Sequence, residues 1–264
     1  MKLSVLSMMV LIVGAPAVGR TQDLETTYQN LKDAETKGDA VAVKKLAAET
    51  SALARKAAAE AAPEDADEKD AWTKRVQYAK DIDIQAEYAL VDVALKSQPA
   101  TTVDLLAALE VQNPKSKYLD EAYANYLYAL SQSGGTAKIP VVAEKALANF
   151  PENPDLLLVM VNYCYSAKQS DRAQSFANRL VAAVMKRAKP EGVAEADWER
   201  QKSSSLGRGY WVSGMVSGEK NQYAAADKNL RAALPYIKGN DAMMAPALFY
   251  RITLRNMEQW RRHA

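Results

Sequence analysis

The stretch EKALANFPENPD, residues 144–155, decides the fold because two prolines interrupt an otherwise helical pattern there. A run of strong helix formers meets Pro151, and a proline inside a helix removes a backbone hydrogen bond and clashes with the preceding turn. Pro154 follows three residues later, and proline is favoured in the first turn of a helix, where its missing N–H is not needed. The stretch therefore predicts that one helix ends and another begins here.

A period of 34 residues surrounds this boundary. Pro154 lies 34 residues after Asp120, and the same spacing separates Leu127 from Val161. A third segment, GYWVSGMVSGEKNQYAAADKNLRAALPY, repeats the pattern and contains Gly214. A glycine inside a helix costs about 1 kcal/mol relative to alanine, so Gly214 should have a packing reason; the alternative is that it ends a short helix. A fixed period of this length indicates stacked helix pairs.

With this pattern the chain resembles the tetratricopeptide repeat (TPR) family over roughly residues 83–250, most clearly from Asp120 onward. The segments KPEGVAEADWERQKSSSLGRGYW and ADKNLRAALPYIKGNDAMMAPALFY also resemble exported bacterial TPR proteins of unassigned role. The resemblance implies an all-α fold, a right-handed superhelix (α-solenoid) of antiparallel TPR-like helix pairs. The residues expected to pack the repeats are Tyr123, Leu127, Ala146, Pro151, Val161, Ala173, Tyr210, Gly214, Ala226 and Ala233.

The expected organisation follows from where the pattern matches and where it is interrupted. In order, the segments are a signal peptide (1–19), an N-terminal helical capping region (20–82), a weak TPR-like unit (83–119), two TPR units (120–187), an inserted helical hairpin segment (188–206), a TPR unit (207–240) and a partial repeat or C-terminal capping helix (241–264). The last segment stays open between a polar-faced cap and a truncated array, because a full unit from Asp241 would run beyond residue 264.

The first nineteen residues, MKLSVLSMMVLIVGAPAVG, have the three parts of an export signal. Lys2 supplies the positive start, residues 3–13 supply an apolar run, and small residues precede a cut after Ala17 or after Gly19. The alternative is an uncleaved membrane anchor. No other segment approaches the roughly 20 apolar residues of a membrane span. We therefore expect a periplasmic or secreted protein with no transmembrane segment in the mature chain.

The TPR resemblance also implies a site, because the first helix of each pair lines a concave groove in that family. The groove candidates on this sequence are Tyr128, Gln132, Asn162, Tyr165, Trp211 and Met215. Some TPR proteins clamp a peptide carboxylate with a lysine and an asparagine; Asn162 matches the second, but Leu158 stands where the lysine should be. The candidates favour an extended peptide or helix instead. For each aromatic residue the alternative is packing between repeats.

The residues needed for catalysis or metal binding are scarce. His263 is the only histidine, which excludes a histidine-based triad and a site with several histidine ligands. Cys164 is the only cysteine, so no internal disulfide forms, and we expect a buried thiol. The acidic stretch 63–70 lacks the glycine and final glutamate of a calcium loop, and residues 134–135 lack the GK[ST] that follows a phosphate loop. We expect no catalytic residue, cofactor or metal.

The charge balance argues against nucleic acid as a partner. The chain has 34 Lys and Arg against 32 Asp and Glu, without the clustered basic face that nucleic acid requires. The leading hypothesis is a non-catalytic exported TPR scaffold that binds a protein or peptide in its concave groove, in a setting such as envelope assembly. The alternative, from a different class, is a structural module that self-associates through its incomplete terminal repeat.

Overall fold

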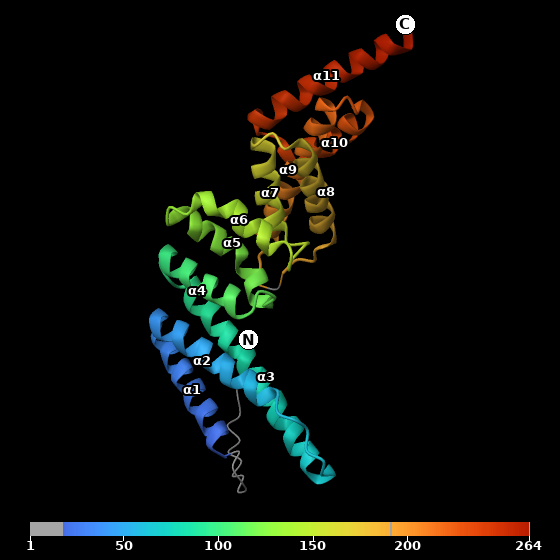
Figure 1. Cartoon of the computed structure of the whole chain (residues 1–264). Coiled ribbons are helices and arrows are strands. Elements are labelled where there is room, and N and C mark those ends of the chain that lie inside the picture. Colours follow the sequence, from blue (N-terminus) through green and yellow to red (C-terminus); the bar gives the residue numbers. More distant parts are fainter. Residues whose placement is uncertain (1–17, 191, 264) are drawn as a thin grey trace. The chain divides into compact units, whose positions relative to one another are not determined.

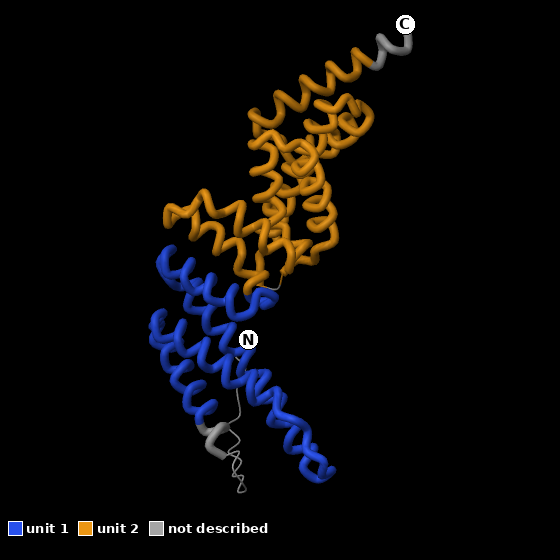
Figure 2. The backbone as a smooth tube through the Cα atoms, viewed as in Figure 1, with its two compact units in different colours: residues 1–118 blue, residues 119–264 orange. Residues whose placement is uncertain are grey.

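The protein is helical throughout the part of the chain that the structure describes. The computed structural model describes residues 18–190 and 192–263, which form eleven α-helices, one short 3-10 helix and no strand (Figure 1). The prediction of an all-α fold is confirmed for these residues. The expected signal peptide (1–19) lies outside them except for its last two residues. A division between Tyr118 and Leu119 separates two units (Figure 2).

Four helices make up the first unit, and α2 packs against the other three. Their bounds are α1 (Val18–Lys37), α2 (Ala40–Ala58), α3 (Ala66–Leu95) and α4 (Pro99–Gln112). Gly38 adopts a φ of 67°, in the left-handed region that glycine tolerates, and this turns the chain between α1 and α2. The side chain of Asp39 then accepts a hydrogen bond from the backbone N–H of Ala42, which caps the start of α2.

One uninterrupted helix crosses the boundary expected between the capping region (20–82) and the weak TPR-like unit (83–119). Helix α3 has 30 residues, and both Ile82 and Ala86 are buried on it. Its apolar face therefore continues through the expected boundary, and α1 to α4 pack as one unit. Asp65 caps the start of α3 by accepting a hydrogen bond from the N–H of Asp67.

The second unit contains the remaining helices, with α9 in contact with α7, α8, α10 and α11. All of α5 except its first two residues belongs to this unit. The bounds are α5 (Lys117–Gln132), η1 (Thr136–Lys138), α6 (Ile139–Ala146), α7 (Pro154–Ser166), α8 (Ser170–Lys186), α9 (Glu195–Glu219), α10 (Tyr223–Ile237) and α11 (Asp241–His263).

The stretch 144–155 forms the boundary between α6 and α7. Helix α6 ends at Ala146, hydrogen-bonded turns follow, and α7 begins at Pro154. Asn153 is buried and caps α7, because its Oδ1 accepts from the N–H groups two and three residues further on, each at 3.0 Å. Its Nδ2 donates to the backbone oxygen of Asp120 at 2.9 Å and to the Asp120 carboxylate at 2.7 Å. This asparagine therefore joins the starts of two successive helix pairs.

Most of the residues expected to pack the repeats are buried. The buried ones are Tyr123, Leu127, Ala146, Val161, Ala173, Gly214, Ala226 and Ala233. Pro151 is exposed in the turn before α7, and Tyr210 is half-buried, with its ring stacked on that of Tyr236 at 6.3 Å between centroids. Helix α9 continues past Gly214 to Glu219, so this glycine does not end a helix.

The inserted segment (188–206) joins α8 to α9, and these two helices pack against each other. Helix α8 ends at Lys186, and α9 runs without a break from Glu195 to Glu219. Pro190 lies in the connection, where a proline favours a helix stop, whereas no proline follows until α10. The insertion therefore supplies a loop and the first half of α9.

None of the described helices combines the length and apolar composition of a membrane span.

Candidate partner-binding site

The six groove candidates lie on three helices of the second unit. They are Tyr128 and Gln132 on α5, Asn162 and Tyr165 on α7, and Trp211 and Met215 on α9. Tyr128, Gln132 and Asn162 are exposed, Tyr128 to 65%, and Tyr165 is half-buried. Trp211 and Met215 are buried, with 6% and 7% exposure, so these two side chains offer little surface to a partner.

Arg208 brings three of the candidates together. Its Nε donates a hydrogen bond of 2.7 Å to Oδ1 of Asn162. Its guanidinium carbon lies 5.4 Å from the ring centroid of Tyr165 and 5.1 Å from that of Trp211. The two rings meet edge to face, 5.3 Å apart at 72°. We call Asn162, Tyr165, Arg208 and Trp211 the Arg208 cluster.

Helical spacing explains how the cluster forms. Asn162 and Tyr165 are three residues apart on α7, and Arg208 and Trp211 are three residues apart on α9, so each pair lies on one helix face. The indole Nε1–H of Trp211 donates a hydrogen bond of 2.8 Å to the carbonyl oxygen of Met243 in the first turn of α11. This bond fixes the ring on which the guanidinium stacks.

The charge of Arg208 has no carboxylate partner among the residues that the structure describes. Burial lowers the pKa of Arg208, and the neighbouring Tyr165 hydroxyl opposes that shift. An arginine keeps its proton at neutral pH nonetheless. In turn, burial and the charge of Glu219 raise the pKa of the Tyr165 hydroxyl, so this group stays neutral. The cluster is thus a half-buried cation on two aromatic rings beside an exposed amide, an arrangement suited to an anionic group.

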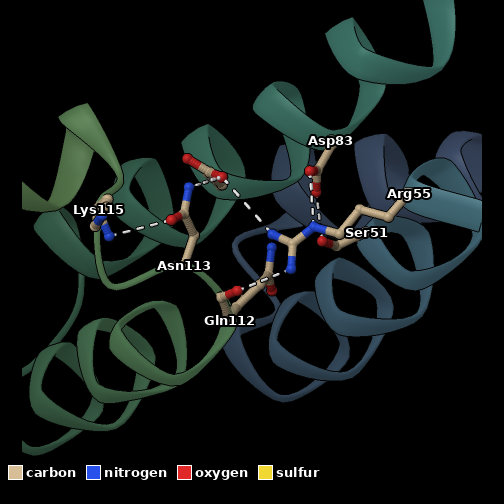
Figure 3. Close-up of polar contacts among 7 residues, drawn as sticks. Ser51, Arg55, Asp83, Gln112, Asn113 and Lys115 are labelled. Atoms are coloured by element: carbon tan, nitrogen blue, oxygen red, sulfur yellow. Dashed lines mark hydrogen bonds and ion pairs between the residues drawn. The ribbon is translucent and has the colours of Figure 1, made fainter. Parts of the chain in front are cut away.

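Arg55, in the first unit, has carboxylate partners, unlike Arg208 (Figure 3). Its Nε lies 2.9 Å from Oδ2 of Asp83, and an Nη atom lies 4.0 Å from the carboxylate of Glu87. Its other Nη donates to the carbonyl oxygen of Gln112 at 2.9 Å, and the Ser51 hydroxyl donates to the same Asp83. Arg55 therefore links α2 to α3 and to the end of α4, and its charge is already matched.

A groove of about 620 Å³ lies between α2 and α4 in the first unit. Four of its ten lining residues are alanine, and Val111, another of them, is 84% exposed. Its charged residues are paired, Lys44 with Asp104 at 2.5 Å and Arg55 with Asp83. Within the described residues the groove therefore presents no unmatched charge to identify a ligand.

A metal site and a reactive thiol would be two further sources of chemistry. Among the described residues, no group of three or more His, Cys, Asp or Glu side chains is placed to hold a metal ion. Cys164 is fully buried and forms no disulfide, and burial raises the pKa of its thiol. Such a thiol is a poor nucleophile because the thiolate is the reactive form.

Arg208 was absent from the candidates expected from sequence, although a signal for it exists. It lies three residues before Trp211 and so shares a helix face with that ring. The groove candidates follow positions of the TPR pattern, and Arg208 does not occupy one of them.

Comparisons with known proteins identify no relative. Scans of known protein families, of curated proteins and of solved structures each give no match.

Proposed function

We propose that the protein is a non-catalytic exported scaffold that binds an extended peptide segment of a partner protein at the Arg208 cluster. In this proposal the helix pairs form a TPR-like right-handed superhelix, and the first helices of the pairs line its concave groove. The packing between consecutive helices in the second unit and the burial of Gly214 between them support that arrangement. Envelope assembly is a setting consistent with export.

The observation that supports binding most directly is the guanidinium of Arg208. Its Nε is occupied by Asn162, but within the described residues its two terminal amino groups have no hydrogen-bond partner. The rings of Tyr165 and Trp211 hold it in place, so little side-chain entropy remains to be lost when a ligand binds. Arginine binds carboxylates through paired hydrogen bonds.

The ligand that fits is a peptide with a carboxylate group, either an acidic side chain or the free C-terminus. Leu158 stands where a clamping lysine would be in the TPR pattern. In this proposal Arg208 supplies the missing cation from α9 rather than from α7. The exposed ring of Tyr128 and the exposed amide of Gln132 on α5 would contact other parts of the peptide.

A peptide-library selection tests the proposal. Random peptides with free and with amidated C-termini are selected on the full-length protein, on Arg208→Gln and on Arg200→Gln. Arg200 is the matched control because it lies on the same helix, is exposed, and forms a 2.8 Å ion pair with Asp197 outside the cluster. We expect acidic or free-acid peptides to be enriched on the parent and on Arg200→Gln, and lost on Arg208→Gln.

Two outcomes would contradict the proposal. Enrichment of the same peptides on the parent and on Arg208→Gln would mean that they bind outside the Arg208 cluster. Failure to enrich any peptide on the parent would count against the scaffold function itself. Circular dichroism of the three proteins confirms that each is folded before selection.

A further inference from the structure

Helix α11 has two apolar faces, and only one of them is covered. Ala247 and Leu254 are buried, at 0% and 4% exposure, where α11 packs against α9 and α10 (Figure 1). On the other side Leu248, Phe249 and Ile252 are 42%, 70% and 62% exposed. Scattered exposed apolar residues are normal on a protein surface, but three within five residues on one helix face form a continuous patch.

The exposed face has the spacing of a helix–helix contact. Asp241, Ala245, Leu248, Ile252 and Arg255 follow one another at alternating intervals of four and three residues, and all five are exposed. This is the spacing with which one helix lines up against another in a two-helix contact. Phe249 flanks the line on the same face. We call these five residues the α11 seam.

The charges of the α11 seam are symmetric about its centre. Asp241 lies seven residues before Leu248, and Arg255 lies seven residues after it. A two-fold axis near Leu248 would set two copies of α11 antiparallel and would bring each Asp241 within a helical turn of Arg255 in the second copy. Parallel pairing would instead set Asp241 against Asp241 and Arg255 against Arg255, which is unfavourable.

These two charges are available for such a contact. Among the described residues, neither Asp241 nor Arg255 has an ion-pair or hydrogen-bond partner through its side chain, and both are exposed. Arg251 differs: it is turned toward α10 and lies 3.0 Å from the carboxylate of Asp227. Arg251, which faces α10, is thus paired within the chain, whereas Asp241 and Arg255 of the α11 seam would complement each other between two antiparallel copies.

We propose that the α11 seam binds a second copy of this chain, in an antiparallel two-fold dimer centred on Leu248. Two-fold pairs are the commonest symmetric assemblies, and they require one self-complementary patch on each subunit. The dimer does not depend on peptide binding at the Arg208 cluster.

Sedimentation equilibrium of the full chain over a concentration series tests for the dimer. We expect a monomer–dimer equilibrium in the parent and at least a tenfold weaker association in Ile252→Asp. Val111→Asp is the matched control, because it removes an exposed valine from α4 in the first unit. It should associate as the parent does. Both residues are exposed, so thermal melts should show that both variants remain folded.

A charge-exchange experiment tests the orientation. Asp241→Arg carries two positive charges on the α11 seam, and Arg255→Asp carries two negative ones. Each variant alone should associate at least tenfold more weakly than the parent, while an equimolar mixture should form a heterodimer, because both cross-pairs then have opposite charge. The double variant Asp241→Arg/Arg255→Asp should recover self-association.

Three results would overturn the proposal. The first is a parent that stays monomeric at the highest concentration reached. The second is an Ile252→Asp variant that dimerises as well as the parent. If Val111→Asp loses association instead, the interface lies in the first unit. The third is a mixture of the two charge variants that shows no preference for heterodimers, which would exclude the antiparallel pairing.

Discussion

Gly214 on α9 lies directly against Leu230 on α10. A Cβ atom at position 214 would stand 2.7 Å from both Cγ and Cδ2 of Leu230, and 3.1 Å from the Leu230 backbone nitrogen. The close approach of the two helices therefore requires a residue without a side chain here. The energetic penalty of glycine in the helix is offset by the packing that it permits.

Gly214→Ala should lower the free energy of unfolding by up to about 2 kcal/mol. Alanine gains about 1 kcal/mol in helix propensity. The new methyl group overlaps Leu230, and overpacking of this kind costs about 1–3 kcal/mol. Because the backbone nitrogen of Leu230 is also close, a change of side-chain rotamer alone does not relieve the overlap. Urea unfolding followed by circular dichroism measures the difference.

The double variant Gly214→Ala/Leu230→Ala is the control for this contact. Leu230 is fully buried, so Leu230→Ala alone should cost about 2–5 kcal/mol through the cavity that it leaves. In that background Gly214→Ala should be neutral or stabilising, since the added methyl enters the cavity. An equal cost of Gly214→Ala in both backgrounds would show that the two residues do not interact.

Asn153→Ala should destabilise the protein more than the loss of an ordinary helix cap. Removing a capping side chain costs about 0.5–2 kcal/mol, and this one also donates two hydrogen bonds to Asp120. Asn153→Asp keeps the acceptor for the start of α7 but places a second carboxylate against Asp120. We therefore expect Asn153→Asp to be destabilised at neutral pH and to recover on acidification, whereas Asn153→Ala should not recover. Urea unfolding at pH 7 and pH 4 distinguishes them.

Asp227 should make stability depend on pH. Burial by itself would raise the pKa of this carboxyl, but hydrogen bonds from Arg251 and Arg231, and their charges, hold its pKa below the ordinary value. A lowered folded-state pKa stabilises the fold above the unfolded pKa of about 3.9, and this contribution is lost as the pH falls through the folded value. Asp227→Asn should thus be less stable at pH 7 and lose less stability on acidification.

The matched control is Asp197→Asn, which removes a carboxylate from an exposed pair with Arg200. Exposed pairs contribute little, so its unfolding curve should follow the parent at every pH. Equal pH dependence in Asp227→Asn and the parent would contradict a role for the Arg251 contact between α10 and α11.

Arg55→Met should lower the stability of the first unit by about 2 kcal/mol. The substitution leaves Asp83 and the nearly buried Glu87 without their cation, and an uncompensated buried charge is costly. Adding Glu87→Gln should recover part of the loss, because the amide at position 87 is neutral and leaves only Asp83 without its cation. Thermal unfolding of the parent, the single variant and the double variant provides the comparison; no recovery would mean that Arg55 acts through packing alone.

The sequence predicted features that depend on local backbone chemistry. Pro154 begins a helix because proline suits a first helical turn, and Gly214 lies at a close helix contact because only packing explains a glycine there. No proline or glycine interrupts α3 at residue 82, so the helix continues through the boundary expected there. Within residues 188–206 the helix breaker Pro190 lies in the first half, before α9 begins at Glu195.

The candidate site was less accessible from sequence, because it depends on contacts between helices. Arg208 and Asn162 are 46 residues apart, and no local pattern places one beside the other. The indole N–H of Trp211 likewise donates to a carbonyl oxygen 32 residues away, in the first turn of α11. The sequence places Asn162 and Tyr165 on one face of a helix, but which side chains on neighbouring faces meet is a property of the packed unit.

The most direct test of the binding proposal is the dissociation constant of one selected peptide for three proteins. Fluorescence anisotropy of the labelled synthetic peptide would be measured with the parent, Arg208→Gln and Arg200→Gln at the same ionic strength. We predict at least a tenfold weaker binding for Arg208→Gln, which is about 1.4 kcal/mol, and no change for Arg200→Gln. Equal binding by the parent and Arg208→Gln would contradict the assignment of the Arg208 cluster as the partner-binding site.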